Sequence, residues 1–487
     1  MDGSETEYVD VLVVGAGISG IDAAYHLQKR CPGKSWLIVE GRERIGGTWD
    51  LFRYPGVRSD SDMFTLGFPF RPWAGDEAIA EGPKIRAYVE ETARAFGIDA
   101  RIRFRHRVTS ASWSSAEARW TVEVEADGEA RRISCGFLYL ASGYYDYERG
   151  YRPDWPGEED FPGRIVHPQF WPDDLDTAGK RIVVIGSGAT AVTLVPALAG
   201  TAARVTMLQR SPSYVVARPS RDLVAKWLQK RLPLPLADKA TRWKNVLLGI
   251  FFFSRARKRP DKVRQLILRM AAENLPEGYD VERHFSPRYD PWDQRLCLVP
   301  DGDLFEAVKA GKVGIVTDEI ERFTADGLRL KSGETLPADI VVTATGLVVK
   351  LLGGIALSVD GAPVNVADRF SYKGMMLSDV PNLAVVFGYT NASWTLKCDL
   401  TARTFCRLLT HMDRHGHTIC VPRLGEIAPE RAPMLDFSSG YVARAAPFLP
   451  SQGPAPPWRI HQNYLKDLAA MRFRSVADSA MEFGRAD

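Results

Sequence analysis

The first residues with recognisable chemistry are the glycines of a short loop near the N-terminus. Gly15, Gly17 and Gly20 form a GxGxxG pattern between an apolar, β-branched run and an amphipathic helical pattern. In such a strand–turn–helix unit the glycines permit a tight turn, let a pyrophosphate approach the backbone and allow close helix packing. A second apolar run, residues 35–39, ends in Glu40, at the spacing where a carboxylate receives ribose hydroxyls. The pattern predicts a dinucleotide site, and a glycine-rich turn followed by a surface carboxylate is the alternative.

The same arrangement recurs in the middle of the chain. Gly186, Gly188 and Ala191 give GxGxxA after an apolar run, and the next run, residues 204–208, leads to Arg210 instead of an acid. A carboxylate there would repel a 2′-phosphate, whereas an arginine pairs with it. The second site is therefore expected to prefer NADP over NAD.

Two dinucleotide sites in one chain predict a flavin and a nicotinamide, because hydride transfer between them requires that both are held together. A disulfide reductase of this architecture would need a reactive cysteine pair near the flavin, and the sequence has no CxxC spacing. Two reactions then remain for the flavin: activation of O2 or simple dehydrogenation. The scattered cysteines are expected to be free and mostly buried: Cys31, Cys135, Cys297, Cys398, Cys406 and Cys420.

The composition is that of an ordinary globular chain. The 487 residues are 45% hydrophobic and 25% charged, which excludes a disordered, collagen-like or disulfide-dense protein. No window has the roughly 18–20 apolar residues of a membrane span. We find no signal-peptide pattern and no nucleic-acid-binding motif. Two or three domains and a cytoplasmic location are expected.

The net charge of +3 is unevenly distributed along the chain. Residues 221–269 contain 14 Lys or Arg and three Asp, with Trp227, Trp243 and Phe251–Phe253 interleaved. Such a segment is either the solvated face of helices or a basic amphipathic surface that contacts anionic lipid. The composition favours the solvated face, and peripheral membrane contact is the alternative.

Two longer segments resemble a known family. Residues 161–172, FPGRIVHPQFWP, are similar to the FxGxxxHxxxW(P/D) fingerprint of the type I Baeyer–Villiger monooxygenases, flavoproteins that insert one oxygen atom of O2 beside a ketone carbonyl. Residues 46–60 resemble the family's second signature, (A/G)GxWxxxx(F/Y)P(G/M)xxxD. The related N- and S-oxygenating flavin monooxygenases usually carry Tyr or Phe in place of Trp171. Residues 290–295 and 388–394 look like the subgroup of ethionamide-activating monooxygenases, and the resemblance covers nearly the whole chain.

The resemblance implies an α/β fold with two Rossmann-like dinucleotide-binding domains, one for FAD and one for NADP. A helical insertion is expected in the NADP domain. The predicted layout is a FAD domain over residues 1–147, a NADP domain over 148–369 with the insertion near 218–288, and a return to the FAD domain over 370–487.

The resemblance also implies a reaction. The family consumes NADPH and O2 and converts a ketone into an ester or lactone. The expected substrate is an apolar ketone or a sulfur-containing small molecule such as a sulfide or thioamide. One alternative is an N- or S-oxygenating flavin monooxygenase without ketone activity. Another is a redox-sensing flavin protein without catalysis. That alternative is disfavoured, because it would assign no role to Arg295 and Asp60, the residues for which the resemblance implies catalysis.

Three residues are the catalytic candidates that follow from the resemblance. Arg295 would stabilise the anionic peroxide formed when reduced FAD meets O2, because arginine remains protonated in a dry pocket. Asp60 would orient Arg295 and reduce the cost of burying it. His167, in the fingerprint, is a weaker candidate, for which a structural or hinge role is favoured.

The expected cofactor-binding residues lie in the two glycine loops and in the family signatures. Many family members carry a lysine before the arginine that corresponds to Arg295. This chain has Gln294 there, so selectivity for the 2′-phosphate would depend more on Arg210 and Ser211. The full set is Gly15, Gly17, Ser19, Gly20, Glu40, Gly47, Thr48, Trp49, Asp50, Leu51, Arg58, Ser59, Asp60, Val108, Gly186, Ser187, Gly188, Ala189, Thr190, Ala191, Arg210 and Ser211.

A histidine-rich stretch, residues 411–417, has HxxxHxH spacing but is not expected to bind a metal. Gly416 follows a helical pattern and is more typical of a helix C-cap, where histidines interact favourably with the helix dipole. No metal site is predicted.

Overall fold

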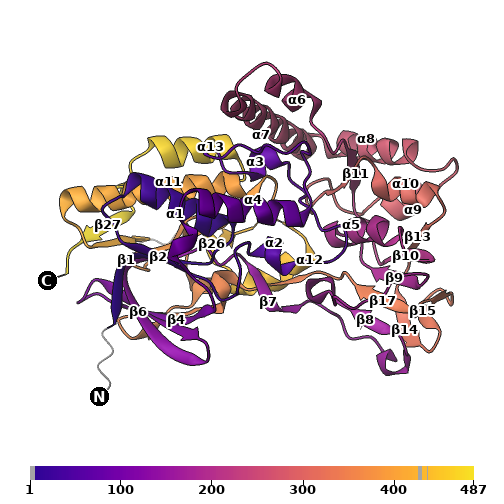
Figure 1. The fold of residues 1–487 in the computed structure, drawn as a ribbon, viewed down its shortest axis with the longest axis horizontal. Helices are drawn as coiled ribbons and strands as arrows, with labels where there is room; N and C mark the ends of the chain where they lie inside the picture. The colour runs from indigo at the N-terminus through magenta and orange to yellow at the C-terminus, as the bar shows by residue number, and fades with distance from the viewer. Residues whose placement is uncertain (1–5, 426–429, 436, 487) are drawn as a thin grey trace.

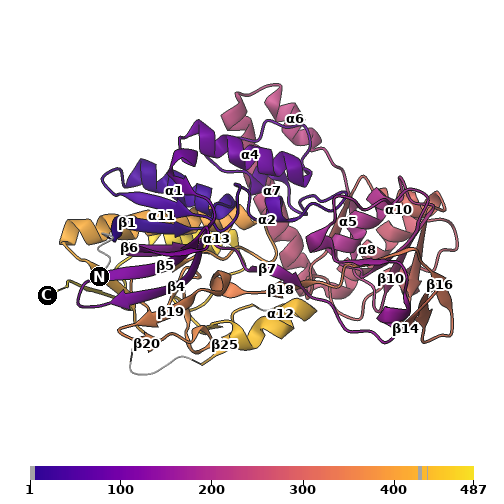
Figure 2. The same cartoon turned by 60° about the horizontal axis from the view of Figure 1, so that its bottom comes forward.

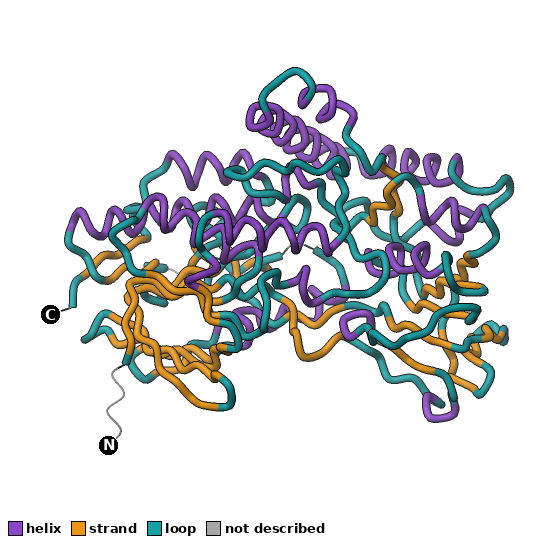
Figure 3. The backbone as a smooth tube through the Cα atoms, in the orientation of Figure 1, coloured by secondary structure: helices purple, strands orange, loops and turns teal. Residues whose placement is uncertain are grey.

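The computed structural model describes residues 6–425, 430–435 and 437–486. Two sheet-centred domains lie side by side along the long axis of the molecule (Figure 1). A helical hairpin, formed by α6 (Leu223–Gln229) and α7 (Leu234–Lys258), projects above them. The strands form two groups in the lower half of the molecule, and most helices lie above them (Figure 3). The predicted α/β fold with two dinucleotide-binding domains is confirmed.

The first domain is built on a nine-stranded sheet. Its strands are β1 (Glu7–Val14), β2 (Trp36–Val39), β3 (Ile102–Arg103), β4 (His106–Ser114), β5 (Arg119–Ala126), β6 (Glu129–Leu140), β19 (Ala356–Val359), β20 (Ala362–Pro363) and β23 (Leu383–Val385). The order is β20-β19-β4-β5-β6-β1-β2-β3, and β23 also pairs with β6. Residues of α1 (Ile18–Arg30), α4 (Gly82–Ala95) and α11 (Trp394–His415) pack in one apolar core with Val11 and Val13 of β1.

The second domain has a five-stranded parallel sheet of order β13-β10-β9-β17-β8. Helices α5 (Ala189–Leu198) and α10 (Asp303–Lys309) pack on one face of this sheet. The antiparallel strands β14 (Ile320–Thr324), β15 (Gly327–Leu330) and β16 (Thr335–Pro337) cover the other face. The parallel strands are β8 (Arg164–Val166), β9 (Arg181–Ile185), β10 (Arg204–Gln209), β13 (Val313–Thr317) and β17 (Ile340–Thr343).

A helical insertion separates the paired strands β11 (Val215–Arg218) and β12 (Cys297–Pro300). It consists of α6 (Leu223–Gln229), α7 (Leu234–Lys258), α8 (Pro260–Glu273) and α9 (Val281–Phe285). Although it interrupts the second domain, its longest helix is anchored on the first. The Arg242 guanidinium of α7 donates to the carbonyls of Phe64 and Gly67, at 3.0 and 2.8 Å. Figure 2 shows α6 and α7 on the same side of the molecule as α4 of the first domain.

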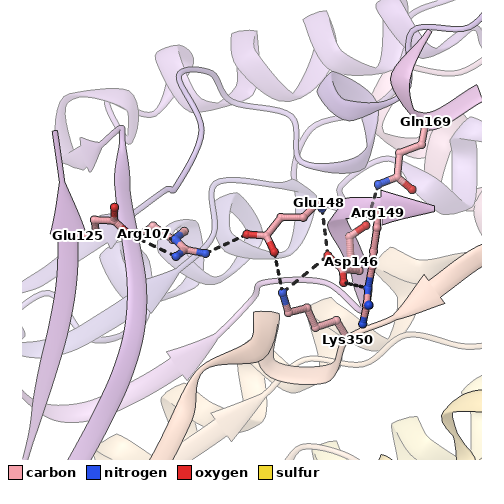
Figure 4. A network of polar contacts seen from close by, with 7 residues as sticks. All are labelled: Arg107, Glu125, Asp146, Glu148, Arg149, Gln169 and Lys350. Carbon is pink, nitrogen blue, oxygen red and sulfur yellow. Dashed lines mark hydrogen bonds and ion pairs between the residues drawn. The ribbon is translucent and has the colours of Figure 1, made fainter. Parts of the chain in front are cut away.

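Two short strands carry the chain between the domains. Strand β7 (Tyr145–Gly150) pairs antiparallel with β18 (Leu347–Val349). Charged side chains around this pair form a network, in which Lys350 lies 3.2 Å from Glu148 and 3.7 Å from Asp146 (Figure 4). The Glu148 carboxylate also accepts a hydrogen bond from Arg107 of β4 at 2.9 Å. The network therefore ties both crossings to the first sheet.

The chain returns to the first sheet earlier than the sequence suggested. The predicted boundary at residue 369 needs correction, because β19 already pairs with β4 over Ala356–Val359. This parallel pairing joins residues about 250 positions apart, so no local pattern marks it. The remaining elements are α2 (Thr48–Leu51), α3 (Met63–Leu66), α12 (Gly440–Ala445), α13 (Tyr464–Leu468), β21 (Ser371–Tyr372), β22 (Met376–Leu377), β24 (Ile419–Pro422), β25 (Ala432–Pro433), β26 (Ser451–Gln452) and β27 (Met481–Gly484).

A buried polar cluster joins α1 to α11. His26 Nδ1 accepts a hydrogen bond from Arg30, so Nε2 carries the proton and donates to Asp399 at 2.9 Å. Asp22 is completely buried, and its oxygens accept no hydrogen bond from any described residue. Burial and the nearby Asp399 raise the pKa of Asp22 well above its ordinary value, which favours the uncharged carboxyl. The cluster thus works as a hydrogen-bonded link between two helices.

Glycine is required by close backbone contact at the first loop. Gly15 adopts φ +107°, and a Cβ at Gly20 would lie 1.9 Å from the Gly15 carbonyl oxygen. Helix α1 therefore approaches the end of β1 more closely than any side chain would allow.

Replacing Gly20 by alanine is expected to lower the free energy of unfolding by roughly 2–3 kcal/mol, because the loop and helix must move apart. Thermal unfolding followed by circular dichroism measures this change. Gly33→Ala is the matched control, since a Cβ at Gly33 meets nothing within 4 Å. Equal unfolding temperatures for the two variants would show that the contact is not tight in solution.

Candidate active site

One large cavity of about 990 Å³ lies between the two domains, and both glycine loops open into it. It brings together 19 of the residues predicted to act in catalysis or cofactor binding. These are Gly15, Gly17, Ser19, Glu40, Gly47, Thr48, Trp49, Arg58, Ser59, Asp60, Val108, Gly186, Ser187, Gly188, Ala189, Thr190, Arg210, Ser211 and Arg295.

Four predicted cofactor residues do not line the cavity: Gly20, Asp50, Leu51 and Ala191. Gly20 and Ala191 are buried on the inner sides of their helices, as expected for positions that permit close packing. Asp50 is buried and lies 2.6 Å from Arg42 and 3.4 Å from Arg53. Burial raises the pKa of Asp50 but its arginine partners outweigh this effect and lower it, so the residue is a charged anchor behind the cavity wall.

The helix that follows each glycine loop begins without a side-chain cap. The N-cap of α1 is Gly17 and that of α5 is Gly188, and neither helix start has a side-chain cap hydrogen bond. Their first backbone N–H groups are free of a capping side chain and the helix dipoles add partial positive charge, an arrangement that suits a phosphate. A Cβ at Gly188 would meet nothing within 4 Å, so the backbone is open to a ligand there. The residues present therefore fit two dinucleotides.

Glu40 lies at the cavity edge and also holds the first loop. Its two carboxylate oxygens accept hydrogen bonds from the backbone N–H groups of Ala16, at 2.7 Å, and Arg42, at 2.9 Å. Burial raises the pKa of Glu40, and the two backbone donors oppose this rise. Each oxygen keeps a lone pair for a further donor, such as a ribose hydroxyl.

Arg295 and Asp60 form a bidentate ion pair inside the cavity. Arg295 Nε lies 2.5 Å from Asp60 Oδ2, and Nη2 donates to Oδ1 at 2.9 Å. Burial alone would lower the pKa of Arg295, but the Asp60 carboxylate raises it above its ordinary value. The side chains keep 35% and 28% of their surface exposed, and both residues line the cavity. The structure thus presents a permanently charged guanidinium of fixed orientation to whatever occupies the cavity.

The segment that carries Asp60 is held against the second domain. A Cβ at Gly56, which has φ +76°, would lie 2.8 Å from Ala197 Cβ of α5, so the backbone runs directly over this helix. Arg58 makes a bidentate ion pair with Asp303 of α10. Its Nη1 and Nη2 atoms donate to the two carboxylate oxygens, at 2.5 and 3.2 Å. These contacts explain how a residue of the first domain reaches an arginine of the second.

An aromatic wall borders the ion pair, and sequence reasoning missed it. The hydroxyls of Tyr144 and Tyr145 are 2.6 Å apart, and the Tyr144 ring stacks on Trp394 at 5.1 Å. Burial raises the pKa of Tyr144, Tyr145 and Tyr441, so they stay neutral. Tyr144 lies directly before β7, whereas Tyr441 comes from α12 and carries no local signal.

The loop before Arg295 has an unusual backbone. Trp292 adopts φ +72°, the left-handed region that bulky side chains rarely occupy. Its ring contacts Phe253 of α7, with ring centroids 6.0 Å apart. Gln294, which replaces the family's lysine, lines the cavity together with Arg210 and Ser211.

His167 lies outside the cavity lining. Its Nδ1 accepts a hydrogen bond from the Gln169 N–H, and its Nε2 lies 3.3 Å from the Gly346 carbonyl oxygen, close to β18. A Cβ at Gly150, the end of β7, would lie 2.0 Å from the His167 ring. The ring therefore packs where the two crossing strands meet, a position that fits the structural or hinge role favoured from the sequence.

The cysteines and the end of α11 agree with what the sequence predicts. All six cysteines are buried and free. Gly416 is the C-cap of α11 with φ +67°, as predicted. Among the described residues, none of the helices has the length and apolar character needed to span a bilayer.

Comparisons with known proteins agree with this architecture. The family model described as pyridine nucleotide-disulphide oxidoreductase matches residues 9–233. The solved structure of an oxidized steroid monooxygenase bound to NADP has a TM-score of 0.75 at 21% identity, covering 98% of this chain and 100% of that one, which shows a shared fold.

Two relatives are similar in sequence over nearly the whole chain. The FAD-containing monooxygenase EthA of Mycobacterium tuberculosis is 56% identical over 482 residues, covering 99% of this chain and 98% of EthA. EthA of Mycolicibacterium smegmatis is 54% identical over 479 residues, covering 98% of this chain and 97% of that protein. With such identity over nearly the full length of both chains, this protein belongs to the family of FAD-containing monooxygenases that includes EthA.

Proposed function

We propose that this monooxygenase carries out Baeyer–Villiger oxidation, inserting one oxygen atom of O2 beside a ketone carbonyl to give an ester or lactone while consuming NADPH. Sulfides and thioamides are proposed as further substrates. The observation that supports this function best is the Arg295–Asp60 ion pair, since it holds a fixed positive charge in a cavity between two dinucleotide loops.

The two glycine loops would hold the cofactors. The first loop, with Glu40 at the ribose, suits FAD, and the second, with Arg210 beside it, suits NADPH. When both are bound, NADPH reduces FAD and the reduced flavin supplies the electrons that activate O2. The chain itself contributes charge, orientation and exclusion of water.

Arg295 would act on negative charge that develops on oxygen during the reaction. A guanidinium placed in a cavity with few competing waters stabilises such charge more strongly than water does, because the donors are already oriented. Asp60 fixes the fork of Arg295 and lowers the cost of burying it. Tyr144 and Tyr441 stay neutral beside the pair and leave its charge balance unchanged.

An apolar substrate fits the walls of the cavity. Trp49, Phe52, Tyr389 and Trp394 line it, together with Tyr441 of the C-terminal region. His167 is proposed to act at a distance, as a positioning residue that keeps β7 and β18 in register while the domains move.

Arg295→Ala is expected to lower ester or lactone formation by roughly 100- to 1,000-fold, because a preorganised charge at the reacting oxygen is lost. Arg295→Lys should recover little of this loss, since a lysine ammonium cannot form a bidentate ion pair with Asp60. Purified, FAD-loaded protein is incubated with NADPH and a panel of linear, cyclic and aryl ketones plus a thioether, and the products are identified by mass.

Arg329→Ala is the matched control for this experiment. Arg329 also pairs with a carboxylate, Glu321 at 3.1 Å, but on the outer antiparallel sheet of the second domain. Sulfoxide as the sole product would move the assignment to the heteroatom-oxygenating class. Full ketone oxidation by Arg295→Ala would contradict the proposed role of this residue.

Arg210 is expected to set the choice of nicotinamide cofactor. Arg210→Ala should raise the KM for NADPH by roughly tenfold or more and change that for NADH little, since one charge-assisted phosphate contact is lost. Gln294→Lys should lower the KM for NADPH relative to that for NADH, because it adds a cation to the lining of the same cavity. Steady-state kinetics measures the KM for NADPH and the KM for NADH in the parent protein and in each variant. An equal change in both KM values would rule out a contact with the 2′-phosphate.

A further inference from the structure

Exposed apolar side chains are concentrated on the helical insertion. Of the sixteen large apolar side chains exposed in the described residues, ten lie between residues 223 and 252, on α6, α7 and their connection. The most exposed are Leu223, Phe251, Leu236, Trp227, Phe252 and Leu247, with 76, 59, 55, 53, 53 and 51% of their surface accessible. Scattered exposed residues are common on proteins, but a concentration of this kind marks an interaction surface.

Helix α7 is apolar on two opposite sides. Leu247, Leu248, Phe251 and Phe252 are spaced i, i+1, i+4 and i+5, so they share the outer face. On the inner side, Val246 is buried against Tyr389 and Leu396. An ordinary surface helix turns polar residues outward, whereas this stretch, residues 246–253, contains no charged residue at all.

The charged residues of the hairpin itself are almost all basic. Residues 223–259 contain ten Lys or Arg and a single acid, Asp238, which is 5% exposed. Arg255, Lys258 and Arg259 follow the outer stripe at its C-terminal end and are exposed. Lys230 and Arg231 lie in the exposed connection between α6 and α7, where Arg231 covers the Trp227 ring at 4.3 Å. The apolar stripe is thus bordered by an excess of cations, of which Lys226 and Arg257 pair with Asp76 and Asp293 outside the hairpin, at 3.3 and 2.5 Å.

We propose that the α6–α7 hairpin docks on an anionic lipid surface, with its apolar stripe in the interfacial region and its basic side chains at the headgroups. Aromatic and leucine side chains on one face and Lys or Arg at the border are the combination that binds such interfaces. A second copy of the chain fits poorly on this face, because two such surfaces would bring their cations together.

The inner side of α7 connects this surface to the cavity. Trp243, Val246 and Ile250 pack with Tyr389 and Ala392, both of which line the cavity. Phe253 contacts Trp292, three residues before Arg295. Docking would therefore place the cavity beside the lipid, where an apolar substrate concentrates. This route for the substrate rests on the proposed function, whereas docking itself does not.

The test uses the full-length, FAD-loaded protein and sedimentation with vesicles of phosphatidylcholine alone or mixed with phosphatidylglycerol. The protein is expected to bind the mixed vesicles and to be released by salt, because the basic border supplies part of the attraction. The double variant Phe251→Ser and Phe252→Ser should bind at least about tenfold more weakly.

The matched control is the double variant Phe448→Ser and Phe473→Ser, which removes two phenylalanines that are 72 and 73% exposed outside the hairpin. It should bind like the parent protein. A second test, Lys258→Glu with Arg259→Glu, keeps the apolar stripe and reverses the charge, and it should abolish the preference for anionic vesicles. FAD content and circular dichroism confirm that each variant is folded.

Three results would overturn the proposal. One is parent protein that binds neither kind of vesicle, and another is equal loss of binding in the hairpin and control variants. The third is a concentration-dependent oligomer that the hairpin variant abolishes while vesicle binding stays unchanged. Since vesicle binding requires no turnover, absence of ketone oxidation would count against the proposed function alone.

Discussion

The central constraint on this structure is that a charged guanidinium must be kept in a cavity without losing its orientation. The Asp60 carboxylate forms a bidentate ion pair with Arg295 and so reduces the free-energy cost of burying its charge. The two residues are 235 positions apart and come from different domains. The close run of residues 54–60 over α5 and the Arg58–Asp303 pair both serve to bring them together. The contacts that fix the two domains relative to each other therefore also fix the geometry of the ion pair.

The same requirement explains the crossing strands. Strands β7 and β18 carry the chain between the sheets, and residues beside them line the cavity. Lys350, Glu148 and Asp146 hold the pair by charge, while the His167 ring packs against its glycine end. A histidine that joins two crossings can affect the reaction rate by keeping the domains in register without touching the substrate.

Helix α7 gives the molecule a second connection, between its surface and its cavity. Its outer face is apolar and exposed, and its inner face packs on residues of the cavity wall. Exposed leucine and phenylalanine side chains lower solubility, so a surface that keeps them needs a compensating contact. In the docking that we propose, an interfacial lipid layer would supply that contact and would also hold the apolar compounds proposed as substrates.

The sequence by itself determined the two glycine loops, the fold class, the family and the candidates Arg295 and Asp60, because these depend on local spacing and on motifs of a few residues. The residues that tertiary structure added have no such local pattern. Tyr441 reaches the ion pair from α12, β19 joins the first sheet beside β4, and His167 lies outside the cavity. The basic stretch over residues 221–269 looked like a solvated helix face, and the exposure of its phenylalanines became visible only after folding. Long-range packing decides these features, since it selects which side chains meet and which stay uncovered.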